Sequence, residues 1–173
     1  MLSVEISLDI DQPLEEVFAY LSNPAHALKW RNTLIDCRPL TSDSLRAGSK
    51  FQERVKLLDQ FVETTYEVIE YVPASCLTYK SIVGTVSDLV CLHLAPTTGG
   101  THLSMSVKRT LEVLFGLAEP LAARAAQRII QADLLTLKEQ LEQRVDDRGS
   151  AGNRHSSSRN RKKKGNSSST RVL

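Results

Sequence analysis

The chain has 173 residues, of which 41% are hydrophobic and 24% are charged, an ordinary balance for one globular domain with a buried core. No stretch is apolar enough for a membrane span, and the first residues lack the basic segment and apolar run of a signal peptide, so we expect a cytoplasmic protein without a transmembrane segment. Cys37, Cys76 and Cys91 are far apart and lack metal-ligand spacing, which argues against a disulfide framework or a zinc site.

Charge divides the chain into two parts. Residues 144–173 hold nine Lys/Arg and two Asp, a net charge of +7, whereas residues 1–143 hold 13 Lys/Arg and 18 Asp/Glu, a net charge of −5. From residue 146 onward apolar side chains are almost absent, so burial cannot offset the entropy lost on ordering. We therefore predict a domain at 1–145 and a disordered, basic, Ser/Gly-rich tail at 146–173. Its charge predicts at most weak contact with anionic lipid or nucleic acid. Because aromatic residues are not interleaved with the basic ones, we predict no sequence-specific nucleic-acid binding.

Residues 3–10 alternate between apolar and polar side chains, a period of two that predicts a strand with one buried face. The next segment, DQPLEEVFAYLSNPAHALKW, carries apolar residues at helical spacing from Leu14 to Leu21. Asn23 and Pro24 then give the signal of an N-cap followed by proline, which ends one helix and begins another. We predict two short helices, with Trp30, the single tryptophan, at the end of the second.

Six further runs between residues 33 and 111 alternate in the same way and are separated by turn residues. They are LIDCRPL, SKFQERVKLL, FVETTYEVIEYV, CLTYKSIV, VSDLVCLHL and THLSMSVKRTL. Their short connections predict an antiparallel meander, seven strands with the first. From residue 117 to 143 the spacing is helical again and predicts the longest helix, with an apolar stripe that includes Leu121, Leu134, Leu137 and Leu141.

This order of elements resembles the SRPBCC (START-like) superfamily, and within it the polyketide cyclase/dehydrase-like group. The similarity covers residues 3–143 and depends on the helix pair, on AGSKFQERVKLL with ETTYEVIEYVPASCLTYKS, on GGTHLSMSV and on the long helix. The resemblance implies an α+β helix-grip fold, in which a curved seven-stranded antiparallel sheet wraps around the C-terminal helix and leaves a deep apolar cavity. It also implies that Trp30 lies at the cavity mouth, although the ring could simply fill the gap between the short helices and the sheet.

Strand parity indicates which polar side chains face inward. Glu53 shares its face with Phe51 and Val55, and a carboxylate there is costly unless it is paired or protonated. It could act as a general acid or base on a carbonyl-rich ligand, or it could pair with a cation or lie near a strand edge. Arg109 shares a face with Met105 and is the natural partner for Glu53, an anchor for a ligand carboxylate, or a strand-end residue that reaches to solvent.

The candidate ligand-binding residues share inward parity or an aromatic ring in the region of the cavity. They are Trp30, Phe51, Tyr66, Tyr79, Asp88 and Met105. The tyrosines could equally be ordinary sheet residues. The four histidines are scattered, and Gly99-Gly100 indicates a hairpin turn and not a phosphate loop, so we predict no metal and no cofactor.

The resemblance supports a hydrophobic pocket more strongly than any reaction. We therefore predict a binding or carrier protein for a small hydrophobic ligand, either lipid-like or polyketide-like. A polyketide cyclase or dehydratase that uses Glu53 and Arg109 is the first alternative, and a protein-interaction module that docks through its curved sheet is the second. A carrier needs a dry pocket, an enzyme an inward acid or base, and an interaction module an exposed apolar patch.

Overall fold

The computed structural model describes residues 2–41, 44–57, 60–111 and 119–152. It divides into two compact units, Met1–Glu142 and Gln143–Leu173. The first unit contains the whole sheet, both short helices and the site discussed below.

The order of elements agrees with the prediction throughout. The elements are β1 (Leu2–Ile10), α1 (Leu14–Leu21), α2 (Pro24–Trp30), β2 (Leu34–Pro39), β3 (Lys50–Leu57), β4 (Gln60–Val72), β5 (Cys76–Gly84), β6 (Val86–Pro96), β7 (Thr101–Leu111) and α3 (Glu119–Gly152). Helix α3 continues beyond the predicted end at residue 143. The predicted disordered tail otherwise falls on residues 153–173, which lie outside the described residues, and it stays a prediction.

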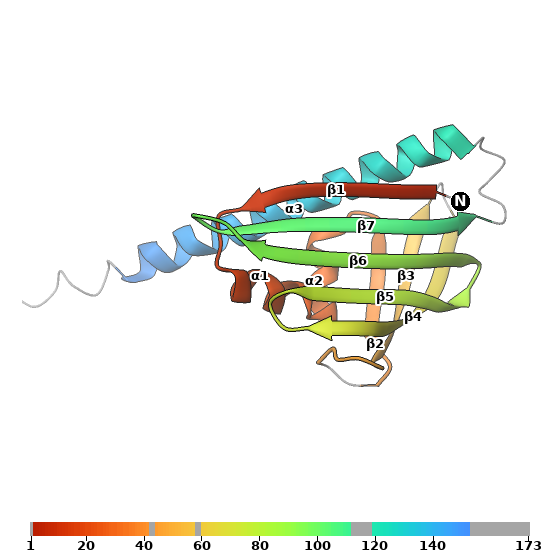
Figure 1. The fold of residues 1–173 in the computed structure, drawn as a ribbon, viewed down its shortest axis with the longest axis horizontal. Coiled ribbons are helices and arrows are strands. Elements are labelled where there is room, and N and C mark those ends of the chain that lie inside the picture. The colour runs from red at the N-terminus through yellow and green to blue at the C-terminus, as the bar shows by residue number, and fades with distance from the viewer. Residues whose placement is uncertain (1, 42–43, 58–59, 112–118, 153–173) are drawn as a thin grey trace, which may run out of the picture. The chain divides into compact units, whose positions relative to one another are not determined.

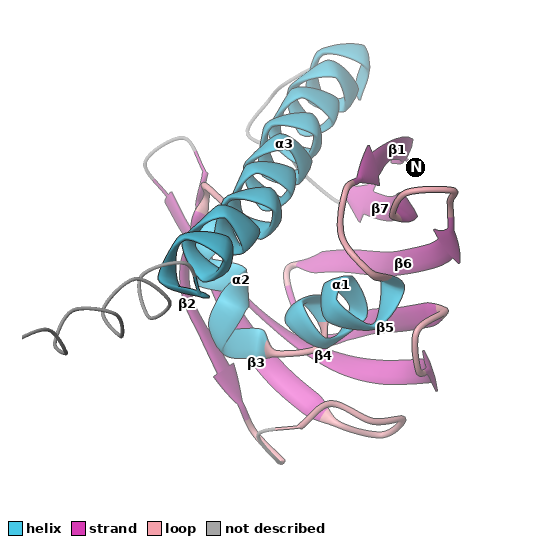
Figure 2. Ribbon diagram, turned by 90° about the vertical axis from the view of Figure 1, so that its left-hand side faces the viewer, coloured by secondary structure: helices cyan, strands magenta, loops and turns pink. Residues whose placement is uncertain are grey.

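All strands belong to one antiparallel sheet with the order β1-β7-β6-β5-β4-β3-β2 (Figure 1). Six consecutive strands form the predicted meander, and β1 joins its far end by pairing with β7 from Leu2↔Arg109 to Ile10↔Thr101. The pairing breaks register between Leu34 and Asp36 in β2 and twice in β4. Such bulges increase local twist and bend, and the sheet curls with α1, α2 and the first unit's part of α3 on its concave side (Figure 2).

The short helices close one end of the curved sheet. The Asn23 side chain accepts a hydrogen bond from the Ala25 backbone amide (3.0 Å), and Pro24 occupies the first position of α2, as the cap-then-proline signal predicts. Helix α1 buries the side chains of Val17 and Phe18 in the hydrophobic core. The helix pair thereby places the end of α2 over the concave face.

The second half of α3 is the part that joins the core. Leu134, Leu137 and Leu141 are buried, whereas Leu121 is 56% exposed, so the predicted apolar stripe is wrong at Leu121. The reason is local: Ala122 is the buried residue of that turn, so the buried side of the helix lies one residue later than the stripe placed it. Among the described residues, no helix combines the length and apolar character needed to cross a membrane.

Polar contacts fix α3 within the first unit. Lys138 Nζ donates to the backbone oxygen of Asp9 (2.6 Å), and the Asp11 amide donates to Glu142 Oε1 (2.9 Å). These contacts attach the helix to the end of β1.

The β6–β7 turn is the hairpin predicted for Gly99-Gly100. Thr97 N donates to the Gly100 oxygen at 2.9 Å. A Cβ on Gly100 would lie 2.1 Å from the backbone oxygen of Ile10, whereas a Cβ on Gly99 would meet nothing within 4 Å. Glycine at position 100 therefore permits the close approach of the end of β1.

Candidate functional site

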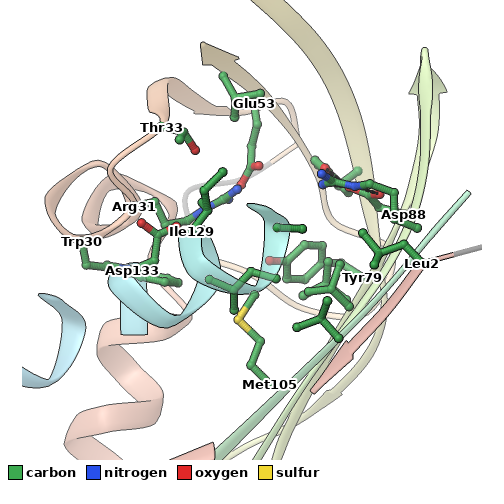
Figure 3. A pocket seen from close by; sticks show the side chains of 18 residues that line it. Leu2, Trp30, Arg31, Thr33, Glu53, Tyr79, Asp88, Met105, Ile129 and Asp133 are labelled. Atoms are coloured by element: carbon green, nitrogen blue, oxygen red, sulfur yellow. Dashed lines mark hydrogen bonds and ion pairs between the residues drawn. The ribbon is translucent and has the colours of Figure 1, made fainter. Parts of the chain in front are cut away.

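A cavity of about 80 Å³ lies between the concave face of the sheet, the end of α2 and α3 (Figure 3). Its walls are mainly apolar: the sheet contributes Leu2, Val4, Val55, Val90, Met105 and Val107, and α3 contributes Ala126, Ile129 and Ile130. Polar and charged side chains form the rest of the lining. Binding pockets typically combine an apolar wall with a few fixed polar groups in this way.

The first polar group is the ion pair of Arg31 and Glu53, in which Arg31 Nη1 donates to Glu53 Oε1 (Figure 3). Glu53 faces inward from β3 and is 4% exposed, as its parity predicts. Burial would lower the pKa of Arg31, but the attraction and hydrogen bond of Glu53 raise it above its ordinary value. The guanidinium therefore stays charged, and Glu53 has a permanent cation beside it.

Of the alternatives for Glu53, pairing with a cation is the one that the structure has, but the cation is Arg31 and not Arg109. Three strands, β4, β5 and β6, separate β3 from β7 in the sheet. Both side chains still line the cavity and a smaller pocket of about 30 Å³, but each forms its ion pair with another residue. Arg31 reaches Glu53 because it follows the last residue of α2 and projects over the concave face.

Arg109 instead pairs with Asp88, directly opposite it on the neighbouring strand. Arg109 Nε and Nη2 donate to the two Asp88 carboxylate oxygens at 2.6 Å each, a bidentate geometry typical of strong pairs. Tyr66 donates a further hydrogen bond from its hydroxyl to Asp88 Oδ2 (3.0 Å). Burial would lower the pKa of Arg109, but its hydrogen bonds to Asp88 and the attraction of that carboxylate raise it.

Three aromatic rings support the floor of the cavity. Phe51 stacks on Tyr66 with a centroid separation of 5.4 Å and meets Tyr79 edge-on at 5.2 Å. Tyr66 and Tyr79 line the cavity, whereas Phe51 contacts both rings and lines, with Tyr79, a smaller pocket of about 30 Å³. Burial is the main cause that raises the pKa of both phenols well above their ordinary value, so both hydroxyls remain protonated at neutral pH.

Asp133 contributes a third carboxyl group from α3. Its Oδ1 accepts hydrogen bonds from the backbone amide and the side-chain amide of Asn32, both at 2.8 Å. Burial raises the pKa of Asp133, although the two hydrogen bonds from Asn32 oppose that rise. Because Asn32 follows Arg31, this contact ties α3 to the segment that supplies the cavity cation.

Trp30 is buried, with 6% of its surface exposed. It lines the main cavity on one side and a second pocket of about 30 Å³ on the other, next to Cys37 and Leu77. This position is compatible with both interpretations of Trp30, as a ligand contact and as a side chain that fills the gap between α2 and the sheet.

Every predicted site residue except Phe51 lines the cavity. Two charged lining residues, Arg31 and Asp133, were not predicted from the sequence. Asp133 had a readable signal, because it lies four residues after Ile129 and four before Leu137, on the apolar side of α3. The sequence gives no such signal for Arg31, because this residue follows the end of a helix and no helical or strand periodicity indicates where its side chain points. Among the described residues, no group of three metal-ligating side chains could hold a metal ion.

A family model described as polyketide cyclase / dehydrase and lipid transport matches residues 1–142. No curated protein matches the sequence.

Solved structures with similar folds come from distant organisms. A protein of Thermus thermophilus has a TM-score of 0.71 at 15% identity, covering 80% of this chain and 96% of that one. Major latex-like protein 151 of Panax ginseng has a TM-score of 0.64 at 10% identity, covering 80% and 96%. A Rhodobacter sphaeroides protein has a TM-score of 0.62 at 21% identity, covering 81% and 91%. At such low identity the likeness concerns the fold alone.

Proposed function

Because the chain belongs to the polyketide cyclase / dehydrase and lipid transport family, we propose that it binds a small, mainly apolar ligand in the cavity and serves as a binding or carrier protein. Membership in this family confirms the predicted resemblance to the SRPBCC superfamily. The observation that carries the proposal is the cavity itself, which has apolar walls from the sheet and α3 and a few fixed polar groups. Burial of a ligand's apolar surface there would supply most of the binding free energy.

The size of the cavity limits the ligand. A buried water needs roughly 10–15 Å³ of such space, and an engineered cavity of about 150 Å³ binds benzene. The cavity of about 80 Å³ is about half the latter volume, so even a ligand with one aromatic ring requires its walls to move apart somewhat. A lipid-like or polyketide-like ligand requires α3 to move outward at Ala126 and Ile129, where its contact with the sheet is interrupted by the cavity.

A cavity-filling variant tests this function. Ala126→Phe adds a ring into the cavity from α3, and Ala125→Phe makes the same change at an exposed position one residue earlier. We expect the wild type and Ala125→Phe to bind acetophenone or 2-acetylnaphthalene, measured by calorimetry and by NMR shifts of the Met105 and Ile129 methyl groups. Ala126→Phe should lose this binding. Retention of full affinity in folded Ala126→Phe, or no binding by the wild type, would refute the proposal.

A second candidate is a polyketide cyclase or dehydratase, and the inward position of Glu53 favours it. This carboxylate lies in the cavity, where it could take a proton from the carbon next to a ligand carbonyl, and Arg31 beside it could stabilise the enolate that forms. In an enzyme, Glu53→Gln should lower turnover by on the order of a hundredfold or more while the substrate still binds. In a carrier, the same change should keep the affinity for an uncharged ligand within about tenfold.

The protein-interaction alternative would use the outer face of the sheet. Phe61 and Val83 are 55% and 65% exposed there, but exposed apolar residues are common on protein surfaces. The cavity is therefore the stronger basis for a function.

A further inference from the structure

The cavity contains cations, but each of them already has a carboxylate partner. Arg31 pairs with Glu53, Arg109 pairs with Asp88, and Asp133 adds a third carboxyl group to the lining. Whether Asp133 is ionised or neutral, the charges of the lining residues sum to zero or less. An anionic ligand would therefore meet no uncompensated positive charge.

Hydrogen-bonding capacity nevertheless remains. Tyr79 is 8% exposed and lines the cavity (Figure 3), and its hydroxyl has no hydrogen bond to any described residue. Arg31 uses Nη1 alone for its hydrogen bond to Glu53, which leaves Nε and Nη2 as donors, and Glu53 Oε2 remains as an acceptor. These groups can satisfy an uncharged oxygen, because a carbonyl accepts from Tyr79 or Arg31 and a hydroxyl also donates to Glu53.

We propose that the cavity selects uncharged ligands whose apolar body carries a carbonyl or hydroxyl oxygen, and that it rejects ligands of the same shape with a carboxylate. This inference rests on the proposed function. A carbonyl loses little on entering, since hydrogen bonds replace those it made to water. A carboxylate can accept the same hydrogen bonds, but it finds no unneutralised positive charge to offset the much larger loss of its hydration. A carboxylate here would also be repelled by Glu53 and Asp88.

The test compares isosteric probes at pH 7. In 2-acetylnaphthalene a methyl group takes the place of one carboxylate oxygen of 2-naphthoate, and acetophenone and benzoate form the corresponding one-ring pair. Calorimetry gives the affinities, and NMR shifts of the Met105 and Ile129 methyl groups place each probe in the cavity. We expect the ketone to bind tighter than its carboxylate by on the order of tenfold or more.

The outcomes separate this inference from the proposed function. Equal binding, or tighter binding of the carboxylate, overturns the selectivity and leaves the function standing. If neither ketone nor carboxylate shifts the cavity methyl groups, the proposed function falls and the inference falls with it.

Two variants test the physical cause. Glu53→Gln leaves the Arg31 guanidinium uncompensated, so naphthoate affinity should rise on the order of tenfold while the ketone's affinity changes much less. Glu63→Gln is the matched control, since it removes the same charge from an exposed side chain of β4, and it should change neither affinity. If circular dichroism shows that Glu53→Gln does not fold, Asp88→Asn frees the other guanidinium in the same way. A folded variant whose naphthoate affinity stays at the wild-type value overturns the inference.

Discussion

Replacement of Arg109 by methionine leaves the buried Asp88 carboxylate without the cation that it faces. Asp88 has a side-chain exposure of 1% and receives two hydrogen bonds from Arg109. Methionine keeps most of the length and apolar volume of arginine, so the change removes charge and donors more than packing. The hydroxyl of Tyr66 remains as a hydrogen-bond donor to Asp88, but it carries no charge.

The size of the effect follows from burial. Removal of one partner of a buried ion pair typically costs about 3–5 kcal/mol. Because the Arg109 side chain is 26% exposed, and because Tyr66 still binds Asp88, we expect a somewhat smaller cost, about 2–4 kcal/mol. For a domain of this size that loss lowers the melting temperature by on the order of 10 °C.

Urea denaturation followed by circular dichroism measures the free energy of unfolding. Arg54→Met is the matched control, because Arg54 and Glu63 form a pair at 3.7 Å whose side chains are 44% and 51% exposed, and it should cost under about 1 kcal/mol. The double variant Asp88→Asn, Arg109→Met should recover part of the loss, because the buried charge is then gone. Similar small losses in the two single variants, or a double variant no more stable than Arg109→Met, would refute the reasoning.

Three further changes test other parts of the structure. Burial raises the pKa of Asp133, so its ionisation lowers the free energy of unfolding as pH rises from about 3.8 through the raised pKa. Asp133→Asn cannot ionise, so urea denaturation should show it gaining stability relative to wild type between pH 4 and pH 7. A stability difference between the two proteins that stays constant over this pH range would contradict the prediction. Burial also raises the pKa of Tyr66 and Tyr79, so ultraviolet titration should show these phenols ionising only when the protein unfolds in alkali. Gly100→Ala should lower the free energy of unfolding by about 1–3 kcal/mol, because the new Cβ collides with the backbone at the end of β1. Gly99→Ala should change it by no more than about 0.5 kcal/mol. Equal losses of stability in the two variants, measured by thermal denaturation, would argue against the collision.

The fold was predictable because its strands carry a strong period of two. Residues 3–10, 86–94 and 101–111 each alternate cleanly, and the structure places a strand at all three. The alternation works here because the concave face is buried and the convex face is largely solvated, so each strand must separate its two faces. The same alternation predicted that the side chains of Glu53 and Asp88 face inward, and both are buried in the structure.

The pairing of charges in the site was not predictable by the same means. Parity assigns a side chain to a face but gives no position across the sheet, and Glu53 and Arg109 lie on strands that are not neighbours. Bulges add a second limit: the β4–β5 register shifts after Thr65, and Val83, which shares the parity of Tyr79, is exposed. Contacts that depend on loop direction, as that of Arg31 does, need the three-dimensional structure.

The position of β1 beside β7 bears on how the protein forms during translation. β1 leaves the ribosome before the other strands of the sheet, yet its partner residues lie about a hundred positions later, from Thr101 to Arg109. Until β7 emerges, the apolar face of β1 has no strand to pair with, and the cavity has no complete wall. Contacts of such long sequence separation slow folding, and an unpaired apolar strand invites aggregation. The nascent domain therefore depends on its last strand and last helix, and a chain arrested before Thr101 should require a chaperone to remain in solution.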